Sequence, residues 1–232
     1  MDLNSVIFIG FYIIILIYSI IIHEVSHGFV ALCLGDSTAK YAGRLNLNPI
    51  SHIDIWGSII VPIAMFIMSG FAFGWAKPVP YNPYNLKNQK WGPLMVAMGG
   101  PASNILIALI AAIIAKMIFI PSAVKTAIII GVKSTSWEQI SAAVSGSFGS
   151  IFFAILMIII FWNVILAFFN LIPFPPLDGS KLLFAIFTFR TEVMIMMEQY
   201  GFVFLILCVM VFSGPLGYFL NAMLNLFFRI TI

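Results

Sequence analysis

The stretch that decides the fold is residues 5–34, SVIFIGFYIIILIYSIIIHEVSHGFVALCL. As an α-helix this apolar run would be about 45 Å long, which exceeds the ~30 Å hydrocarbon core of a bilayer. Its second half contains His23, Glu24 and His27. Ionisable side chains inside a membrane helix cost a few kcal/mol each and are rare without a function. The run therefore predicts a membrane helix that carries a functional site.

The composition of the whole chain excludes a water-soluble fold. Apolar residues make up 62% of the 232 residues and charged residues only 8%, whereas about 25% of a soluble domain is charged. Long apolar runs broken by Gly, Pro and Asn favour helices over the alternating pattern of an outer-membrane barrel. We expect an all-α polytopic membrane protein that forms one domain over residues 1–232, with no nucleic-acid surface. Its core would cover about 5–190 and its C-terminal helices about 196–229.

The apolar runs predict about four to six transmembrane or re-entrant helices around a buried metal site, with a short edge-strand or loop element. Residues 94–120 and 150–171 are long enough to span. Residues 55–73 are only marginally long and contain Pro62, and the Pro- and Asn-rich residues 74–93 cannot span. The remaining expectations are a loop with one short helix (124–132) over 121–149, a short helix over 180–188, and two helices or one broken helix over 200–229.

The positions of the 11 Lys and Arg residues predict the topology. If residues 55–73 enter and leave on the same side, one face receives Lys40, Arg44, Lys77, Lys87, Lys90, Lys181 and Arg190. The opposite face receives Lys125 and Lys133. This bias predicts an N-terminus outside. His23 lies roughly 16 Å before the end of its helix, so the metal site is expected toward the cytoplasmic side. We expect the protein in the plasma membrane. A re-entrant backbone is tolerated only if it is buried in protein or lines a water-filled cavity, so a cavity is expected.

The sequence His23-Glu24-Val25-Ser26-His27 has the H-E-x-x-H pattern. Side chains at i and i+4 lie on one side of a helix, so both imidazoles can hold one Zn²⁺ with Glu24 beside them as base for its water. The chance expectation for this pattern in a chain of this composition is on the order of 10⁻³. The alternative is that the two histidines only form hydrogen bonds between helices, with Glu24 paired or protonated.

A catalytic zinc site needs a third protein ligand and an open fourth position. Asp178 and Asp54 are the serious candidates, because the other acidic residues besides Glu24 lie in or beside loops: Asp2, Asp36, Glu138, Glu192 and Glu198. Asp178 is preferred, since three prolines in residues 170–179, NLIPFPPLDG, break the helix and Gly179 permits close backbone approach. The alternative role for Asp178 is to cap the helix that follows. His52 and Asp54 are the second choice, although such a pair more often satisfies turn amides.

Three motifs resemble those of the site-2 protease family of intramembrane zinc metalloproteases. HEVSH (23–27) resembles the family's HExxH, NLIPFPPLDG (170–179) is similar to its N-x-x-P-x-P-x-x-D-G element, and GGPASN (99–104) resembles its G-P-x-x-N element. The resemblance implies one zinc ion per chain, bound by His23, His27 and Asp178, and Glu24 as the catalytic glutamate. It also implies Asn170 as a polar residue near the site. HExxH in the first helix, without PDZ or CBS domains, resembles the short, minimal branch.

The leading functional interpretation is an intramembrane endopeptidase that cleaves transmembrane segments of other membrane proteins. A helical substrate must unwind, most simply by pairing as an extended strand, and residues 74–80 are a candidate edge strand or lid. A plain interfacial loop is the alternative for this segment. Asn170 is placed to touch substrate or to order the Asp178 turn, whereas Asn163 is expected only to join helices.

Two other functions are compatible with ionisable residues inside the bilayer. A metal-ion transporter or metal-binding sensor would also place His and Asp there, but it would not need Glu24, and it would need polar residues along a path through the membrane. A catalytically silent scaffold for membrane helices is the third possibility, and the intact Glu24 argues against it.

Overall fold

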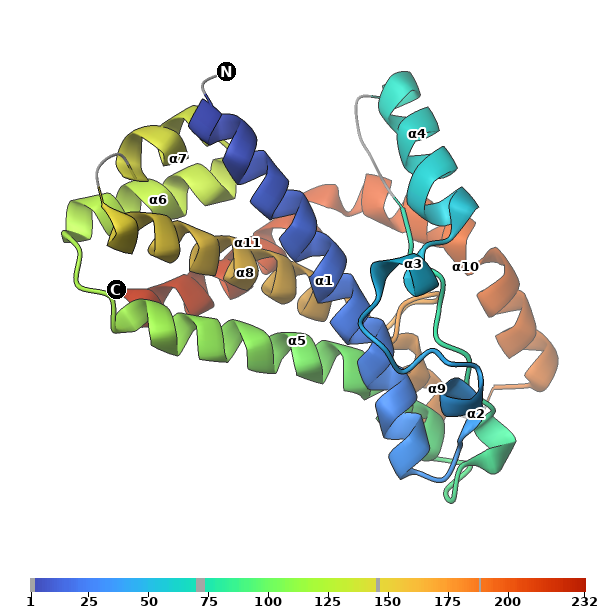
Figure 1. The fold of residues 1–232 in the computed structure, drawn as a ribbon. Helices are drawn as coiled ribbons and strands as arrows, with labels where there is room; N and C mark the ends of the chain where they lie inside the picture. The colour runs from blue at the N-terminus through green and yellow to red at the C-terminus, as the bar shows by residue number, and fades with distance from the viewer. Residues whose placement is uncertain (1–2, 70–73, 145–146, 188) are drawn as a thin grey trace. The chain divides into compact units, whose positions relative to one another are not determined.

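The computed structural model describes residues 3–69, 74–144, 147–187 and 189–232 (Figure 1). Helices joined by short loops make up this part of the chain, and no β-strand occurs within it. The chain forms two compact units, one of Ile20–Gly100 and the other of Met1–Ser19 with Pro101–Ile232. The prediction of an all-α polytopic membrane protein is confirmed.

Three helices are long and apolar enough to cross a membrane: α1 (Leu3–Cys33), α5 (Gly92–Lys116) and α8 (Phe148–Asn170). Their bounds lie close to the predicted runs, because the backbone groups of apolar runs this long can find hydrogen-bond partners in a membrane only as helices. Helices α10 (Thr191–Val211) and α11 (Ser213–Thr231) meet at a bend of 85° and could together form a fourth span. By length and composition, the described part therefore contains three candidate spanning helices, or up to four.

Residues 55–73 do not form a spanning helix in the described part. A π-helix, η1 (Ile55–Ile60), runs into α4 (Val61–Ser69), and the apolar helix is too short to span. Its start is capped by Asp54, whose Oδ1 accepts a hydrogen bond of 2.7 Å from the N–H of Gly57. The last residues of the predicted segment, 70–73, lie outside the described residues. The short length agrees with a non-crossing segment, which stays a prediction.

The prediction for residues 121–149 was wrong in extent. The structure has two helices there, α6 (Ser122–Ser134) and α7 (Trp137–Val144), instead of a loop with one short helix. Thr135 ends α6 in the left-handed conformation with a φ of 52°. Both helices pack against α8 and against each other, and their Ile128 and Ile140 are fully buried. Gly131, one of the residues that suggested a loop, instead lies where α6 meets Ile140 of α7.

The core of the larger unit forms around α8, whose side chains Phe153, Met157, Ile160 and Val164 are fully buried. Their spacing of three or four residues places them on one face of the helix. In α5, small residues are buried in the same core: Ala108, Ala111, Ala112 and Ala115. Small residues let membrane helices approach closely. Within lipid, the resulting van der Waals packing takes the place of the hydrophobic effect that drives association in water.

A buried polar network joins three of these helices. The Asn104 Nδ2 group donates to Oδ1 of Asn163 at 2.7 Å and lies 3.3 Å from the carbonyl of Ser19. The Nδ2 group of Asn163 donates to the Ser19 hydroxyl at 2.9 Å. All three residues are buried. The prediction that Asn163 joins helices is confirmed, and the network fixes α1 at Ser19, one turn before His23.

The smaller unit contains the second half of α1, the start of α5 and several short elements between them. These elements are α2 (Thr38–Tyr41), α3 (Pro49–His52), η1, α4 and a 3₁₀ helix, η2 (Pro83–Asn85). An irregular stretch, residues 74–82, precedes η2. The Pro and Asn content of this stretch prevents a helix, as predicted.

Candidate metal centre

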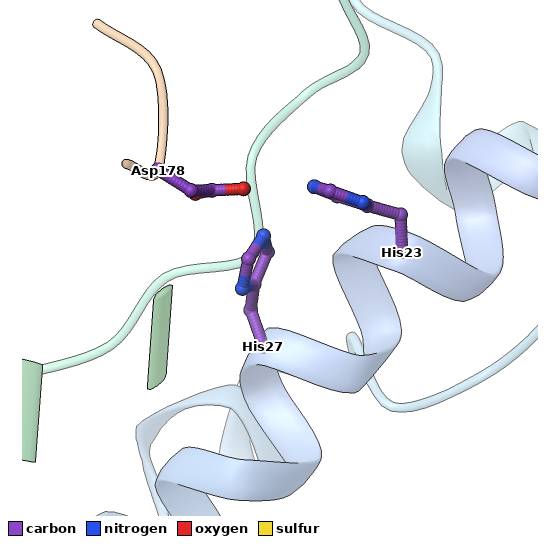
Figure 2. Close-up of side chains that lie close together, drawn as sticks. All are labelled: His23, His27 and Asp178. Atoms are coloured by element: carbon purple, nitrogen blue, oxygen red, sulfur yellow. The ribbon is translucent and has the colours of Figure 1, made fainter. Parts of the chain in front are cut away.

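His23 and His27 project from one face of α1 (Figure 2). Their ring centroids are 4.7 Å apart and their planes are nearly perpendicular, at 88°. His23 is buried and His27 is half-buried. One helical turn separates the two residues, as the i, i+4 spacing requires. Two imidazoles in this arrangement can share one metal ion.

The hydrogen bond of His27 selects the tautomer that a metal ligand needs. Its Nδ1 lies 2.8 Å from the carbonyl oxygen of Val96 in α5. Because a carbonyl only accepts, Nδ1 carries the hydrogen and Nε2 keeps a lone pair for a metal. The N–H of Gly100 lies farther from Nδ1, at 3.3 Å, and cannot donate to a nitrogen that is itself protonated. A backbone carbonyl on the second ring nitrogen is the usual support of a metal-binding histidine.

Gly100 is required because α5 approaches both imidazoles closely. A Cβ atom on Gly100 would lie 2.5 Å from Nε2 of His23 and 2.6 Å from Cε1 of His27. These distances are too short for non-bonded atoms, so any side chain at this position would displace the rings. Only glycine leaves room for both histidines in this orientation.

We expect Gly100→Ala to lower the affinity for zinc by about 10-fold or more, the scale on which disturbed ligand orientation acts. The measurement is zinc retained during titration with a chelator. Gly10→Ala in α1 is the matched control, because a Cβ atom there meets nothing within 4 Å. Both substitutions add the same methyl group inside a helix. Equal zinc retention in the two variants would contradict the required glycine.

Glu24, between the two histidines on α1, is half-buried. Its Oε2 accepts a hydrogen bond of 3.0 Å from the backbone N–H of Val79. Val79 lies in the irregular stretch that follows α4 and is itself buried, with 6% of its surface exposed. The sequence therefore places a carboxylate beside the histidines, and the fold holds one of its oxygens.

The Asp178 turn follows the end of α8. The N–H of Gly179 donates to the carbonyl of Asn170 at 2.7 Å, which brings the residue after Asp178 back to the helix end. A Cβ atom on Gly179 would lie 2.3 Å from the oxygen of Leu171, so this return also requires glycine. The peptide bond between Pro175 and Pro176 is cis.

Helix α9 (Ser180–Ile186) begins directly after this turn. Its N-cap position is Gly179, which has no side chain of its own to cap the helix. The alternative role of Asp178, capping this helix, stays a prediction. The hydroxyl of Ser180 donates to the carbonyl of Leu177 at 2.7 Å.

The predicted ligands come together in the structure. One ligand atom from each of His23, His27 and Asp178 lies within 4.8 Å of the other two (Figure 2). Two imidazole nitrogens and a carboxylate oxygen are the donor set of a catalytic zinc site with three protein ligands. Among the described residues, no other group of three His, Cys, Asp or Glu side chains gathers in this way. That these three bind the metal stays a prediction.

His52 and Asp54, the second choice, have structural partners instead. Nε2 of His52 lies 2.8 Å from the carbonyl oxygen of Asn46, and the carboxylate of Asp54 caps η1 at Gly57. Both side chains therefore satisfy turn groups, as H-x-D pairs in loops commonly do.

Asn170 contributes to the site through its backbone. Its carbonyl accepts from Gly179 as described above, and its side-chain Nδ2 donates to the carbonyl of Leu166 in its own helix at 2.9 Å. Of the two roles considered for Asn170, ordering the Asp178 turn is the one that these contacts support. Contact with a substrate stays a prediction.

Comparison with known proteins agrees with this geometry. Residues 11–214 match the description of peptidase family M50. The chain is 35% identical over 218 residues to YwhC of Bacillus subtilis, named as a candidate zinc metalloprotease, and the match covers 92% of this chain and 85% of YwhC. It is 23% identical over 175 residues to Rip2 of Mycolicibacterium smegmatis, named in the same way, with 74% of this chain and 56% of Rip2 covered. No solved structure matches.

The family match and the match to YwhC cover most of the chain, including HEVSH and Asp178. The donor set at α1 suits the zinc ion that both relatives' names specify. The apolar helices place the chain in a membrane. This chain belongs to peptidase family M50, the site-2 protease family, and is an integral membrane zinc metalloprotease.

Proposed function

We propose that the protein is an intramembrane endopeptidase that hydrolyses peptide bonds within or near transmembrane segments of other membrane proteins. The observation that carries the proposal is the place of HEVSH. Its histidines and Glu24 lie on α1, a helix apolar enough to cross a membrane. A peptidase that acts only on soluble peptides would have no need of a site on such a helix.

In the proposed mechanism, His23, His27 and Asp178 would hold one zinc ion. When bound, zinc would supply Lewis acidity toward the scissile carbonyl and would lower the pKa of a water to about 7. Glu24 takes the proton from that water and passes it to the leaving amine. The hydrogen bond from Val79 to Oε2 of Glu24 supports this role, because it leaves the other carboxylate oxygen available.

A substrate segment has to be extended for cleavage, since a helix hides its peptide bonds in its own hydrogen bonds. Residues 75–80 offer a place to bind it. Trp75 and Lys77 use both of their backbone groups in hydrogen bonds within the protein, and Val79 uses its N–H. Ala76 forms no hydrogen bond within the described residues. We propose that a substrate strand pairs with Ala76 and that Asn170 contacts it as well.

Purified protein and a membrane protein substrate with one transmembrane helix test the proposed function. Cleavage within or near that helix should stop when zinc is removed by a chelator, and it should return when zinc is added. Transport of zinc across vesicle membranes without cleavage would instead support a metal-ion transporter. Bound zinc with neither activity would support a sensor or scaffold.

We further propose that the protein lies in the plasma membrane with its N-terminus outside and the metal site toward the cytoplasm. The support is the charge bias of the loops together with the short helix η1–α4, which need not cross. Tyr84, in the loop before α5, would then be inside, and Ser122, after α5, outside.

Cysteine labelling tests this topology. In a chain without Cys33 and Cys208, we expect Ser122→Cys to react with a membrane-impermeant maleimide on intact cells. Tyr84→Cys should react only after lysis, although the Tyr84 side chain is 81% exposed. Each variant is the control for the other. Labelling of Tyr84→Cys from outside would overturn the orientation.

A further inference from the structure

The irregular stretch after α4 contains the sequence Trp75-Ala76-Lys77-Pro78-Val79-Pro80, which we call the 75–80 segment. Its first residue is fixed on both sides by η1. The N–H of Trp75 donates to the carbonyl of Gly57 at 3.0 Å, and the hydroxyl of Ser58 donates to the carbonyl of Trp75 at 2.9 Å. The start of the segment is therefore anchored without any help from the metal centre.

Lys77 is anchored in the same way. Its N–H donates to the carbonyl of His52 at 2.9 Å, and its carbonyl accepts from Nη2 of Arg44 at 2.7 Å. Arg44 is buried, so this charge-assisted bond is shielded from water. Trp75 and Lys77 thus use both backbone groups to bind η1, the end of α3 and Arg44.

The chain just after the segment is held by Asp36. Its Oδ2 accepts from the N–H of Asn82 at 2.7 Å, while Oδ1 accepts from Nδ2 of Asn85 and the N–H of Thr38. Burial of Asp36 raises its pKa, but the hydrogen bonds from Thr38, Asn85 and Asn82 outweigh this and lower the pKa below its ordinary value. Asp36 is therefore ionised at neutral pH and a strong acceptor. The segment is held before and after Val79.

Between these anchors, Val79 makes two contacts with α1. Its N–H donates to Oε2 of Glu24. Its side chain packs closely on Gly28, since a Cβ atom on Gly28 would lie only 2.7 Å from Val79 Cγ1. Glu24 and Gly28 are one turn apart on α1. Because Pro78 and Pro80 have no N–H, Val79 supplies the one backbone donor of residues 78–80. Val79 thus contacts α1 through its backbone donor and, separately, through its side chain.

We propose that the backbone N–H of Val79 is a positioning group for Glu24, the general base. It holds Oε2 and leaves Oε1, which has no hydrogen bond among the described residues, free to take the proton. The inference rests on the proposed function. The anchors at Trp75, Lys77 and Asn82 hold the segment without Glu24, so the Val79 bond acts on the carboxylate and is not needed to hold the segment.

The expected benefit is geometric. A general base must lie within about 2.6–3.2 Å of the proton that it takes. A glutamate has three rotatable side-chain bonds, and a displacement of the reacting group by about 1 Å can lower a rate by about 100-fold. A donor on a segment fixed at both ends restricts the carboxylate to one orientation before substrate arrives.

Val79→Pro tests the proposal, because it removes the N–H and keeps an apolar residue. Val79→Ala is the matched variant, which keeps the N–H and loses the side-chain contact with Gly28. We expect Val79→Pro to have a kcat about 10- to 100-fold below that of Val79→Ala, with zinc content unchanged and KM within about threefold. A merely structural role would lower zinc content or change KM as well.

Equal kcat values for the two variants would overturn the proposal. If Val79→Pro does not fold, valine can be replaced by its α-hydroxy acid, which exchanges the N–H for an ester oxygen and keeps the side chain. The ester should then show the same selective loss of kcat. A kcat equal to that of wild type in the ester protein would equally reject the positioning role.

The hydrogen bond can also be measured without activity. In protein labelled with ¹⁵N-valine, the Val79 amide signal is the one that Val79→Ala removes. Glu24→Ala should shift this signal and speed its exchange with solvent, whether zinc is bound or removed, whereas Ser26→Ala on the same turn should not. A Val79 signal whose shift and exchange rate are unchanged by Glu24→Ala would refute the bond. The spectrum is independent of the proposed function, whose failure would appear as a wild-type protein without zinc-dependent cleavage.

Discussion

Glu24→Gln is expected to lower the rate of cleavage by about 100- to 10,000-fold, the contribution of a positioned general base, while the protein keeps its zinc. Glutamine has nearly the shape of glutamate, and its side-chain oxygen can still accept the hydrogen bond from Val79. The histidines on either side are unchanged. The substitution therefore removes the ability to take a proton and little else.

The measurement is the rate of cleavage of a membrane substrate together with zinc per chain, each compared with wild type. Glu138→Gln, at an exposed position in the first turn of α7, is the control for the loss of one carboxylate and should cleave like wild type. Unchanged cleavage by Glu24→Gln would show that another group is the base. Loss of zinc in that variant would show that Glu24 belongs to the metal ligands.

The spanning helices could be predicted from the sequence because the membrane leaves few choices. An apolar run as long as residues 5–34 has to satisfy its backbone groups internally, and helix α1 (Leu3–Cys33) is the result. The same holds for α8 (Phe148–Asn170), predicted as residues 150–171. Composition alone decides such elements, and their ends differ from the prediction by only a few residues.

Residues 121–149 show where composition misleads. Their Ser and Gly residues would favour a loop in water, but small residues at membrane-helix contacts allow close packing. At Gly131 in α6, a Cβ atom would lie 2.8 Å from Ile140 in α7, so glycine is there to admit the neighbouring helix. The sequence cannot show which neighbour a small residue serves, and hence whether it ends a helix or packs one.

Some groups of the metal centre could likewise be predicted from the sequence, and others could not. His23 and His27 were predictable because their relation is local to one helix. The carbonyl of Val96 and the N–H of Val79 were not predicted, since every residue carries such groups and no side chain marks them. The signals that could have indicated them are indirect. They are the glycine at position 100 and the prolines on both sides of Val79.

Asp178→Ala is expected to lower the affinity for zinc by more than about 100-fold, because the loss of a direct ligand should exceed the 10- to 100-fold cost of losing an outer-shell partner. Cleavage should be lost with the metal. The Asp178 turn itself should remain, since the Gly179 bond to Asn170 and the Ser180 bond to Leu177 do not involve the carboxylate. Zinc content and a chelator titration measure the effect.

Asp54→Ala is the matched control, because it removes the other aspartate that the sequence offered as a ligand. Its carboxylate caps η1 at Gly57. Its loss should therefore lower the free energy of unfolding by about 1 kcal/mol and leave zinc in place. The reverse result, with zinc lost in Asp54→Ala and kept in Asp178→Ala, would exchange the two assignments. Zinc kept in both variants would mean that the third ligand is not a carboxylate of either residue. A centre of two histidines and Asp178 requires that zinc is lost in Asp178→Ala and kept in Asp54→Ala.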